Sequence, residues 1–150
     1  MLTTDGFSDL AEGTDVFLAS SGRSGTTWVQ ELINHAHDHR VIFEPFLGTV
    51  VPFCRHFERK QYLRAADDSP AFLGPARTIL GGDFRNEWTD QYNDRRVYRR
   101  RLVKDIRANL LLHWLRRHFP RVPIVFLSGH AGPQQVRAGL RRPCTHRLRW

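Results

Sequence analysis

The feature that most constrains the fold is an abrupt change of hydrophobic period near the N-terminus. Residues 15–19, Asp-Val-Phe-Leu-Ala, form a short apolar run that indicates a buried strand. The next residues, 20–25, are polar and include two glycines, which indicates a tight loop. Apolar residues then recur at helical spacing, which predicts a helix over 26–37. Its apolar face would comprise Trp28, Val29, Leu32, Ile33 and Ala36.

Further apolar runs extend this pattern along the chain. Residues 40–44 predict a second short strand, and 102–105 a third. A helical face follows the third strand and should end before Pro120, and residues 124–127 then predict a fully buried strand. Strand, helix and strand in succession at both ends imply parallel pairing, so the sequence predicts an α/β layer architecture. The middle of the chain is less regular; there we predict a helix over 53–66.

Composition restricts the classes of partner and compartment. A chain of 150 residues with 41% hydrophobic side chains can enclose one globular core without disulfides or a structural metal. The net charge of +8 arises mainly in the C-terminal third, because residues 106–150 carry nine arginines and no acidic residue. The rest of the chain is near neutral, which argues against nucleic acid as a partner. Two cysteines, no apolar run of membrane-spanning length and no signal peptide favour a cytoplasmic protein.

The loop after the first predicted strand has the parts of a phosphate cradle. The loop leads into the N-terminus of a helix, where unpaired backbone N–H groups and the positive end of the helix dipole favour the binding of an anion. Gly25 allows close approach of the backbone, Thr26 and Thr27 add hydroxyl groups, and Arg23 adds a fixed charge. A Walker A loop would need lysine directly after Gly25, where this chain has threonine. A kinase-like phosphotransferase is therefore a weaker alternative.

The order Arg23-Ser24-Gly25-Thr26-Thr27-Trp28 resembles the 5′-phosphosulfate loop of sulfotransferases that use 3′-phosphoadenosine 5′-phosphosulfate (PAPS). Two other segments strengthen the resemblance. Residues 43–46, Phe-Glu-Pro-Phe, look like an element that follows the first helix in carbohydrate-type and many bacterial members. Residues 104–107, followed by a leucine-rich helix and Phe-Pro, are similar to the segment that leads into the second cofactor motif. The resemblance spans residues 15–127.

The resemblance implies a three-layer, P-loop-like α/β fold with a central parallel sheet, incomplete at the C-terminus. It implies PAPS as sulfuryl donor, a small-molecule or carbohydrate acceptor, and no metal. Arg23 and the loop from Ser24 to Thr27 would bind the phosphosulfate and stabilise the leaving group, and Trp28 would stack on adenine. Glu44 would take the proton of the acceptor hydroxyl. The structural alternatives are a solvated carboxylate for Glu44 and a core position for Trp28.

The chain departs from the family after residue 127. Residues 128–135 read Ser-Gly-His-Ala-Gly-Pro-Gln-Gln, where family members carry the motif that holds the 3′-phosphate. We therefore predict a partial sulfotransferase domain over 1–127 and a divergent, poorly ordered Arg/Gly/Pro-rich tail over 128–150. Loss of the 3′-phosphate contacts predicts low affinity for PAPS, and an inactive chain is one expected outcome.

Other clusters favour structural interpretations. His35, His37 and His39 alternate, but they lie where a helix should end, so we expect solvated loop histidines rather than metal ligands. The basic run 95–101 should be a solvated helix face paired with acidic residues upstream. A basic nucleic-acid-binding module is the remaining alternative from outside the enzymes. The sequence identifies neither the acceptor nor the oligomeric state.

Overall fold

The computed structural model describes residues 8–9 and 15–128. Four parallel strands form its main sheet: β2 (Val16–Ser20), β3 (His39–Phe43), β5 (Arg100–Asp105) and β6 (Ile124–Leu127). The helices are α1 (Thr26–Ile33), α2 (Pro70–Leu80) and α3 (Leu112–His118), with short 3-10 turns η2 (Pro52–Cys54) and η3 (Ala108–Leu111). A second, two-stranded sheet joins β1 (Ser8–Asp9) to β4 (Val97–Tyr98). The predicted α/β class with a parallel sheet is confirmed.

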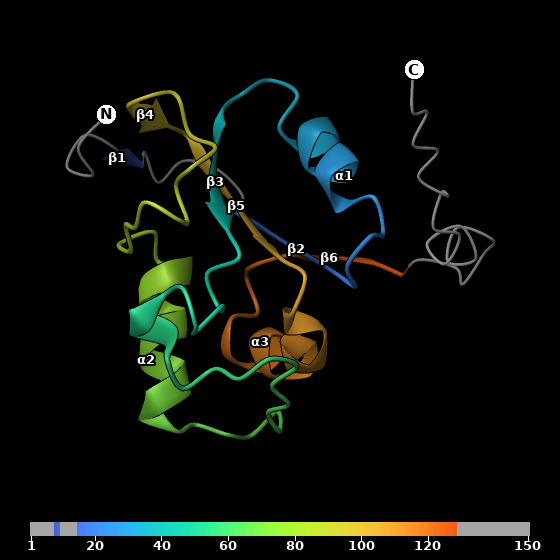
Figure 1. The fold of residues 1–150 in the computed structure, drawn as a ribbon, viewed down its shortest axis with the longest axis vertical. Helices are drawn as coiled ribbons and strands as arrows, with labels where there is room; N and C mark the ends of the chain where they lie inside the picture. The colour runs from blue at the N-terminus through green and yellow to red at the C-terminus, as the bar shows by residue number, and fades with distance from the viewer. Residues whose placement is uncertain (1–7, 10–14, 129–150) are drawn as a thin grey trace, which may run out of the picture.

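The strand order β3-β5-β2-β6 places β2 inside the sheet (Figure 1). Its two neighbours come from much later in the chain, since Val16 pairs with Leu102 and Phe17 with Ile124. The chain leaves β2 through α1 toward β3, and it later leaves β5 through α3 to reach β6 on the opposite side of β2. Open parallel sheets bind ligands where connections diverge in this way, at the carboxyl ends of the strands.

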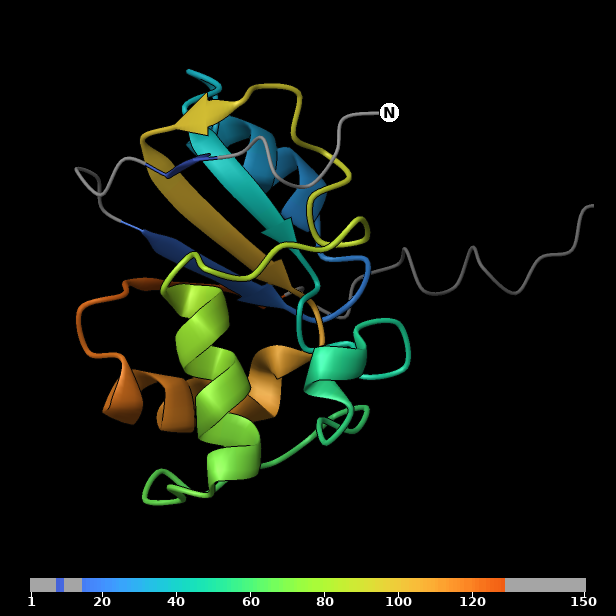
Figure 2. The ribbon, with the colours of Figure 1, turned by 90° about the vertical axis from the view of Figure 1, so that its left-hand side faces the viewer.

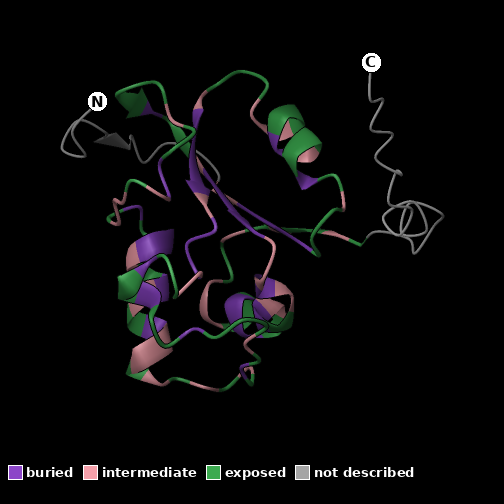
Figure 3. Cartoon of the chain, viewed as in Figure 1, coloured by how far each residue is buried: buried purple, intermediate pink, exposed green. Residues whose placement is uncertain are grey.

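The core lies on one face of the sheet. Figures 1 and 2 show α1 on one side of the strands, with α2 and α3 together on the other. The buried hydrophobic cluster includes residues of the strands, α2 and α3, and Figure 3 colours buried residues of these elements purple. Trp114 of α3 is fully buried there, and its indole Nε1 donates a hydrogen bond to the carbonyl of Asp67, 2.6 Å away. Most of the buried apolar side chains therefore lie on this face of the sheet.

The other face is covered less completely. Trp28 and Leu32 of α1 are 69% and 51% exposed, so the apolar stripe predicted for this helix is not buried. The helix also ends at Ile33 rather than near residue 37. Asn34 causes this, because its backbone N–H donates to the carbonyl of Gln30 while its side-chain oxygen accepts from the backbone N–H of His39 and turns the chain into β3.

Three further local predictions are wrong. The segment 53–66 contains only the end of η2 and turns, and Lys60 within it has a φ of 61°, which an α-helix does not allow. The basic run 95–101 is mostly exposed, as predicted, but it is not helical: residues 97–98 form β4, residues 100–101 begin β5, and the other three have no regular structure. Strand β6 is half open instead of fully buried, with Val125 and Phe126 38% and 50% exposed, because among the described residues it pairs with β2 alone.

The histidines divide between two environments. His35 and His37 are exposed, as predicted, whereas His39 is the first residue of β3 and only 4% exposed. Desolvation by burial lowers the pKa of His39. Within the part of the chain that the structure describes, no group of three or more His, Cys, Asp or Glu side chains forms a potential metal site. The same residues contain no helix long and apolar enough to cross a membrane. The predicted tail after Ser128 lies outside the described residues.

Candidate functional site

The loop between β2 and α1 adopts two left-handed backbone conformations. Arg23 has a φ of 63° and Gly25 a φ of 81°. The Ser24 hydroxyl donates to the carbonyl of Ser21 at 2.5 Å, which closes the turn between them. Gly25 is the N-cap of α1 and brings no side chain to the first backbone N–H groups of the helix. The predicted strand, tight loop and helix are therefore present, and the loop presents a helix N-terminus without a side-chain cap.

A cavity of about 270 Å³ opens beside this loop, and four predicted site residues line it: Arg23, Thr26, Thr27 and Glu44. They come from two segments, because Glu44 follows β3, two strands away from the loop. The remaining lining residues are Gln30, Glu31, Phe43, Tyr92, Lys104 and Ile106. The fold thus places the predicted base and the predicted anion-binding loop around one space.

Lys104 is the main residue of this cavity that the sequence did not identify. It is the penultimate residue of β5, beside β2, and its Nζ donates to the Thr27 hydroxyl at 3.1 Å. The Nζ atom also lies 5.4 Å from the centre of the Phe43 ring. Burial lowers the pKa of Lys104, while the nearby carboxylates of Glu44 and Glu31 act in the opposite direction. The side chain therefore brings a largely desolvated amine to the first turn of α1.

Glu44 is buried and paired rather than solvated. It is 6% exposed, and Arg107 holds its Oε2 in an ion pair through Nη1. Its backbone N–H donates to the carbonyl of Lys104 at 2.7 Å, so the end of β3 stays joined to the end of β5. Glu44 also has a φ of 41°, in the left-handed region that favours glycine. The solvated alternative is wrong, because the carboxylate is withdrawn from solvent and faces a cation.

Asp105 connects the segments that carry this pair. Its carboxylate accepts the backbone N–H groups of Phe46 at 3.1 Å and Arg107 at 2.8 Å. Complete burial raises its pKa to about 6, although both hydrogen bonds favour the charged form. Asp105 therefore positions the residues after β3 relative to those after β5.

Not every predicted residue lines the cavity. Ser24 and Gly25 shape the loop but do not line that space, and Trp28 lies away from it with most of its ring exposed. The core alternative for Trp28 is wrong for the same reason. The sequence missed Lys104 and Arg107 because their place in the site depends on β5 inserting between β3 and β2, which no local pattern specifies. The local signals were a pair of basic residues around the end of an apolar strand and the resemblance of residues 104–107 to the segment before the second cofactor motif.

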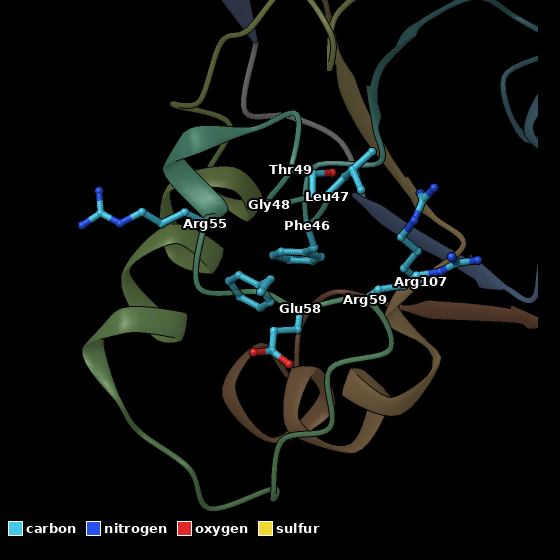
Figure 4. Close-up of a pocket in the computed structure, with 9 residues that line it drawn as sticks. Phe46, Leu47, Gly48, Thr49, Arg55, Glu58, Arg59 and Arg107 are labelled. Atoms are coloured by element: carbon cyan, nitrogen blue, oxygen red, sulfur yellow. The ribbon is translucent and has the colours of Figure 1, made fainter.

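Two larger hollows adjoin the site. One of about 520 Å³ includes Ser21 and Gly22 of the loop, together with Arg107. The other, of about 650 Å³, lies below residues 46–49 and is drawn in Figure 4. Arg59 and Arg107 line both hollows, and their side chains point to the same side in Figure 4. Neighbouring hollows at the carboxyl edge of the sheet therefore share lining residues, and each has at least one arginine in its lining.

Comparison with known proteins gives no assignment: no protein-family model, no curated protein and no solved structure matches this chain.

Proposed function

We propose that this chain is a sulfotransferase domain that binds PAPS at the loop after β2 and transfers its sulfuryl group to an acceptor hydroxyl. The observation that carries the proposal is the single cavity in which Arg23 and Thr27 of the loop, the Glu44 carboxylate and the Lys104 amine meet. The resemblance of residues 23–28 to a 5′-phosphosulfate loop supports the same activity. A P-loop-like, three-layer fold is part of the proposal, since the loop follows an interior strand of a parallel sheet.

The residues present suit a phosphosulfate group. An uncapped helix N-terminus offers backbone N–H donors, and Arg23, Lys104 and the Thr27 hydroxyl add charge and hydrogen bonds beside it. PAPS, when bound, supplies the sulfuryl group and a phosphate leaving group. Negative charge grows on that leaving oxygen as its bond to sulfur breaks, and Arg23 and Lys104 are placed to stabilise it. The same donors would bind the ground state less strongly, which is the condition for catalysis.

Glu44 is the proton acceptor in this proposal. As the acceptor oxygen forms its bond to sulfur, the hydroxyl proton passes to the Glu44 carboxylate. Arg107 fixes the orientation of that carboxylate through Oε2, while Asp105 fixes the Arg107 backbone. Phe43 and Tyr92, with ring centroids 5.0 Å apart, form an aromatic wall beside the carboxylate. An acceptor with an apolar ring face and a hydroxyl group fits these walls.

Isothermal titration with adenosine 3′,5′-bisphosphate tests the binding step. We expect micromolar or weaker binding by the wild-type chain and loss of about tenfold or more with Arg23→Ala, because a charged hydrogen-bond donor is removed. Arg121→Ala is the matched control, since Arg121 is exposed and lies outside all of these cavities. Equal loss in both variants, or no heat with the wild-type chain at any concentration, would contradict the proposal.

Sulfuryl transfer tests the assignment of Glu44. With a panel of phenolic and sugar acceptors and radiolabelled PAPS, Glu44→Gln should abolish transfer while leaving nucleotide affinity within about threefold, since Glu44 would contact the acceptor rather than the nucleotide. Random-sequence DNA distinguishes the remaining alternative. A nucleic-acid-binding module would bind it with strong salt dependence and would respond equally to Arg23→Ala and Arg121→Ala.

A further inference from the structure

The hollow of about 520 Å³ adjoins the loop at Ser21 and Gly22, whereas the Glu44 cavity adjoins it at Arg23, Thr26 and Thr27. Three segments that are far apart in the chain line it: the loop residues Ser21 and Gly22, the pair Arg59 and Lys60, and residues 106–110. Ile106 lines both spaces, so the hollow adjoins the proposed reaction site. A ligand seated on the loop can therefore extend into it.

The charge in this hollow has one sign. Arg59, Lys60 and Arg107 line it, and none of the lining residues that the structure describes is acidic. Lys60 has a φ of 61°, a conformation that costs an ordinary residue on the order of 1 kcal/mol and that glycine would adopt freely. Arg59 and Lys60 are exposed, so no packing role in the core explains these cations. Their convergence favours an anionic ligand.

Two other residues that line the hollow bear on the chemistry of such a ligand. Asn109 also lines the hollow, although its side-chain oxygen is itself buried, without a hydrogen-bond partner among the described residues. Leu110 is 48% exposed and gives the hollow an apolar wall. Cations beside an apolar wall together suit an ester of phosphate or sulfate on an organic group.

We infer that Arg59 and Lys60 form a second oxyanion site, which binds a phosphate or sulfate ester group in addition to the one at the Arg23 loop. The inference rests on the proposed function, which places the first oxyanion on the loop. The second group would belong either to the nucleotide, as its 3′-phosphate, or to a sulfated acceptor. Both sources present the same tetrahedral anion to the same two cations.

The test is a double variant, Arg59→Gln with Lys60→Gln, compared with the charge-conserving pair Arg59→Lys with Lys60→Arg. Binding of adenosine 3′,5′-bisphosphate, adenosine 5′-phosphate and a sulfated disaccharide is measured by titration. If the nucleotide fills the hollow, the first variant loses about tenfold in affinity for the bisphosphate and little for the monophosphate. If a sulfated acceptor fills it, the disaccharide alone loses affinity. The charge-conserving pair should retain wild-type affinity in either case.

Unchanged affinity of the glutamine variant for all three ligands would overturn the inference. Equal losses in the glutamine variant and in Arg121→Gln, an exposed arginine outside the hollow, would overturn it too, because the effect would then be one of overall charge. Failure of the proposed function would give a different result. Neither nucleotide would then bind the wild-type chain, while the affinity for the sulfated disaccharide would still test whether the hollow binds an anion. Both substituted residues are exposed, so we expect the fold to be unchanged, and thermal unfolding of each variant checks this.

Discussion

The backbone conformation of Arg23 should lower the stability of the fold, while its side chain contributes to nucleotide binding. Its φ of 63° lies in the left-handed region, which costs an L-residue about 1–2 kcal/mol relative to glycine. Arg23→Gly removes this strain, and Arg23→Ala keeps it. The exposed guanidinium is lost in both variants, so their difference isolates the backbone. Part of the gain is offset because glycine loses more conformational entropy on folding, about 0.5–1 kcal/mol. The glycine variant should thus be more stable than the alanine variant by about 1 kcal/mol.

Urea unfolding followed by circular dichroism measures this difference, and the midpoint of thermal unfolding should differ by about 3 °C for a domain of this size. Neither variant should bind adenosine 3′,5′-bisphosphate with wild-type affinity. The same pair of substitutions at Arg121, which has no left-handed φ, is the control and should show alanine as the more stable variant. An alanine variant at position 23 that equals or exceeds the glycine variant in stability would refute the argument that the loop is strained.

Three other substitutions test the scaffold around the site. Gly48→Ala should destabilise the fold by about 2 kcal/mol or more, because the new Cβ would lie 2.5 Å from the carbonyl oxygen of Cys54 and the backbone must move; urea unfolding measures this. Arg40→Met should cost about 3–5 kcal/mol in the same assay, since it leaves the Asp90 carboxylate, 2.7 Å from the Arg40 Nε in the wild type, buried without its cation. The Asp105 carboxyl has a pKa raised from 3.8 to about 6, so between these values it is neutral in the folded chain and ionised in the unfolded chain. Its contribution to the free energy of unfolding is therefore full below about pH 4 and falls as pH rises through about 6. Asp105→Asn should remove that fall from the pH profile of the unfolding free energy, and an unchanged profile would contradict the assignment.

Local patterns predicted the elements that short stretches of chain determine. The run at 15–19 became β2 and the polar stretch after it became the loop, because a buried strand and a glycine turn each depend on a few neighbouring residues. The helix over 53–66 was wrong because its apolar residues are held by different partners: the Phe57 ring packs on Phe46 and Phe72, with centroids 4.7 and 5.1 Å away, from a turn rather than from a helix. Tertiary contacts there outweigh the local spacing.

The sequence predicted only some of the residues that line the candidate site. Arg23, Thr26 and Thr27 lie within one contiguous motif, and Glu44 was placed by its position after the second strand. Lys104 could not be found in this way, because its amine reaches Thr27 only when β5 lies beside β2. Strand order depends on pairing between residues 61 or more positions apart, which hydrophobic period does not encode.

The interior position of β2 also determines when the loop can take its shape during synthesis. Every residue of the 20–27 segment leaves the ribosome early, yet both strands that hydrogen-bond to β2 lie between residues 100 and 127. A peptide of residues 15–45 would carry the whole motif and lack the ladder that holds it, so the loop cannot be grafted or excised as a short module. Because such distant pairings form slowly, the nascent chain passes through a long interval in which the motif is present but has no binding geometry.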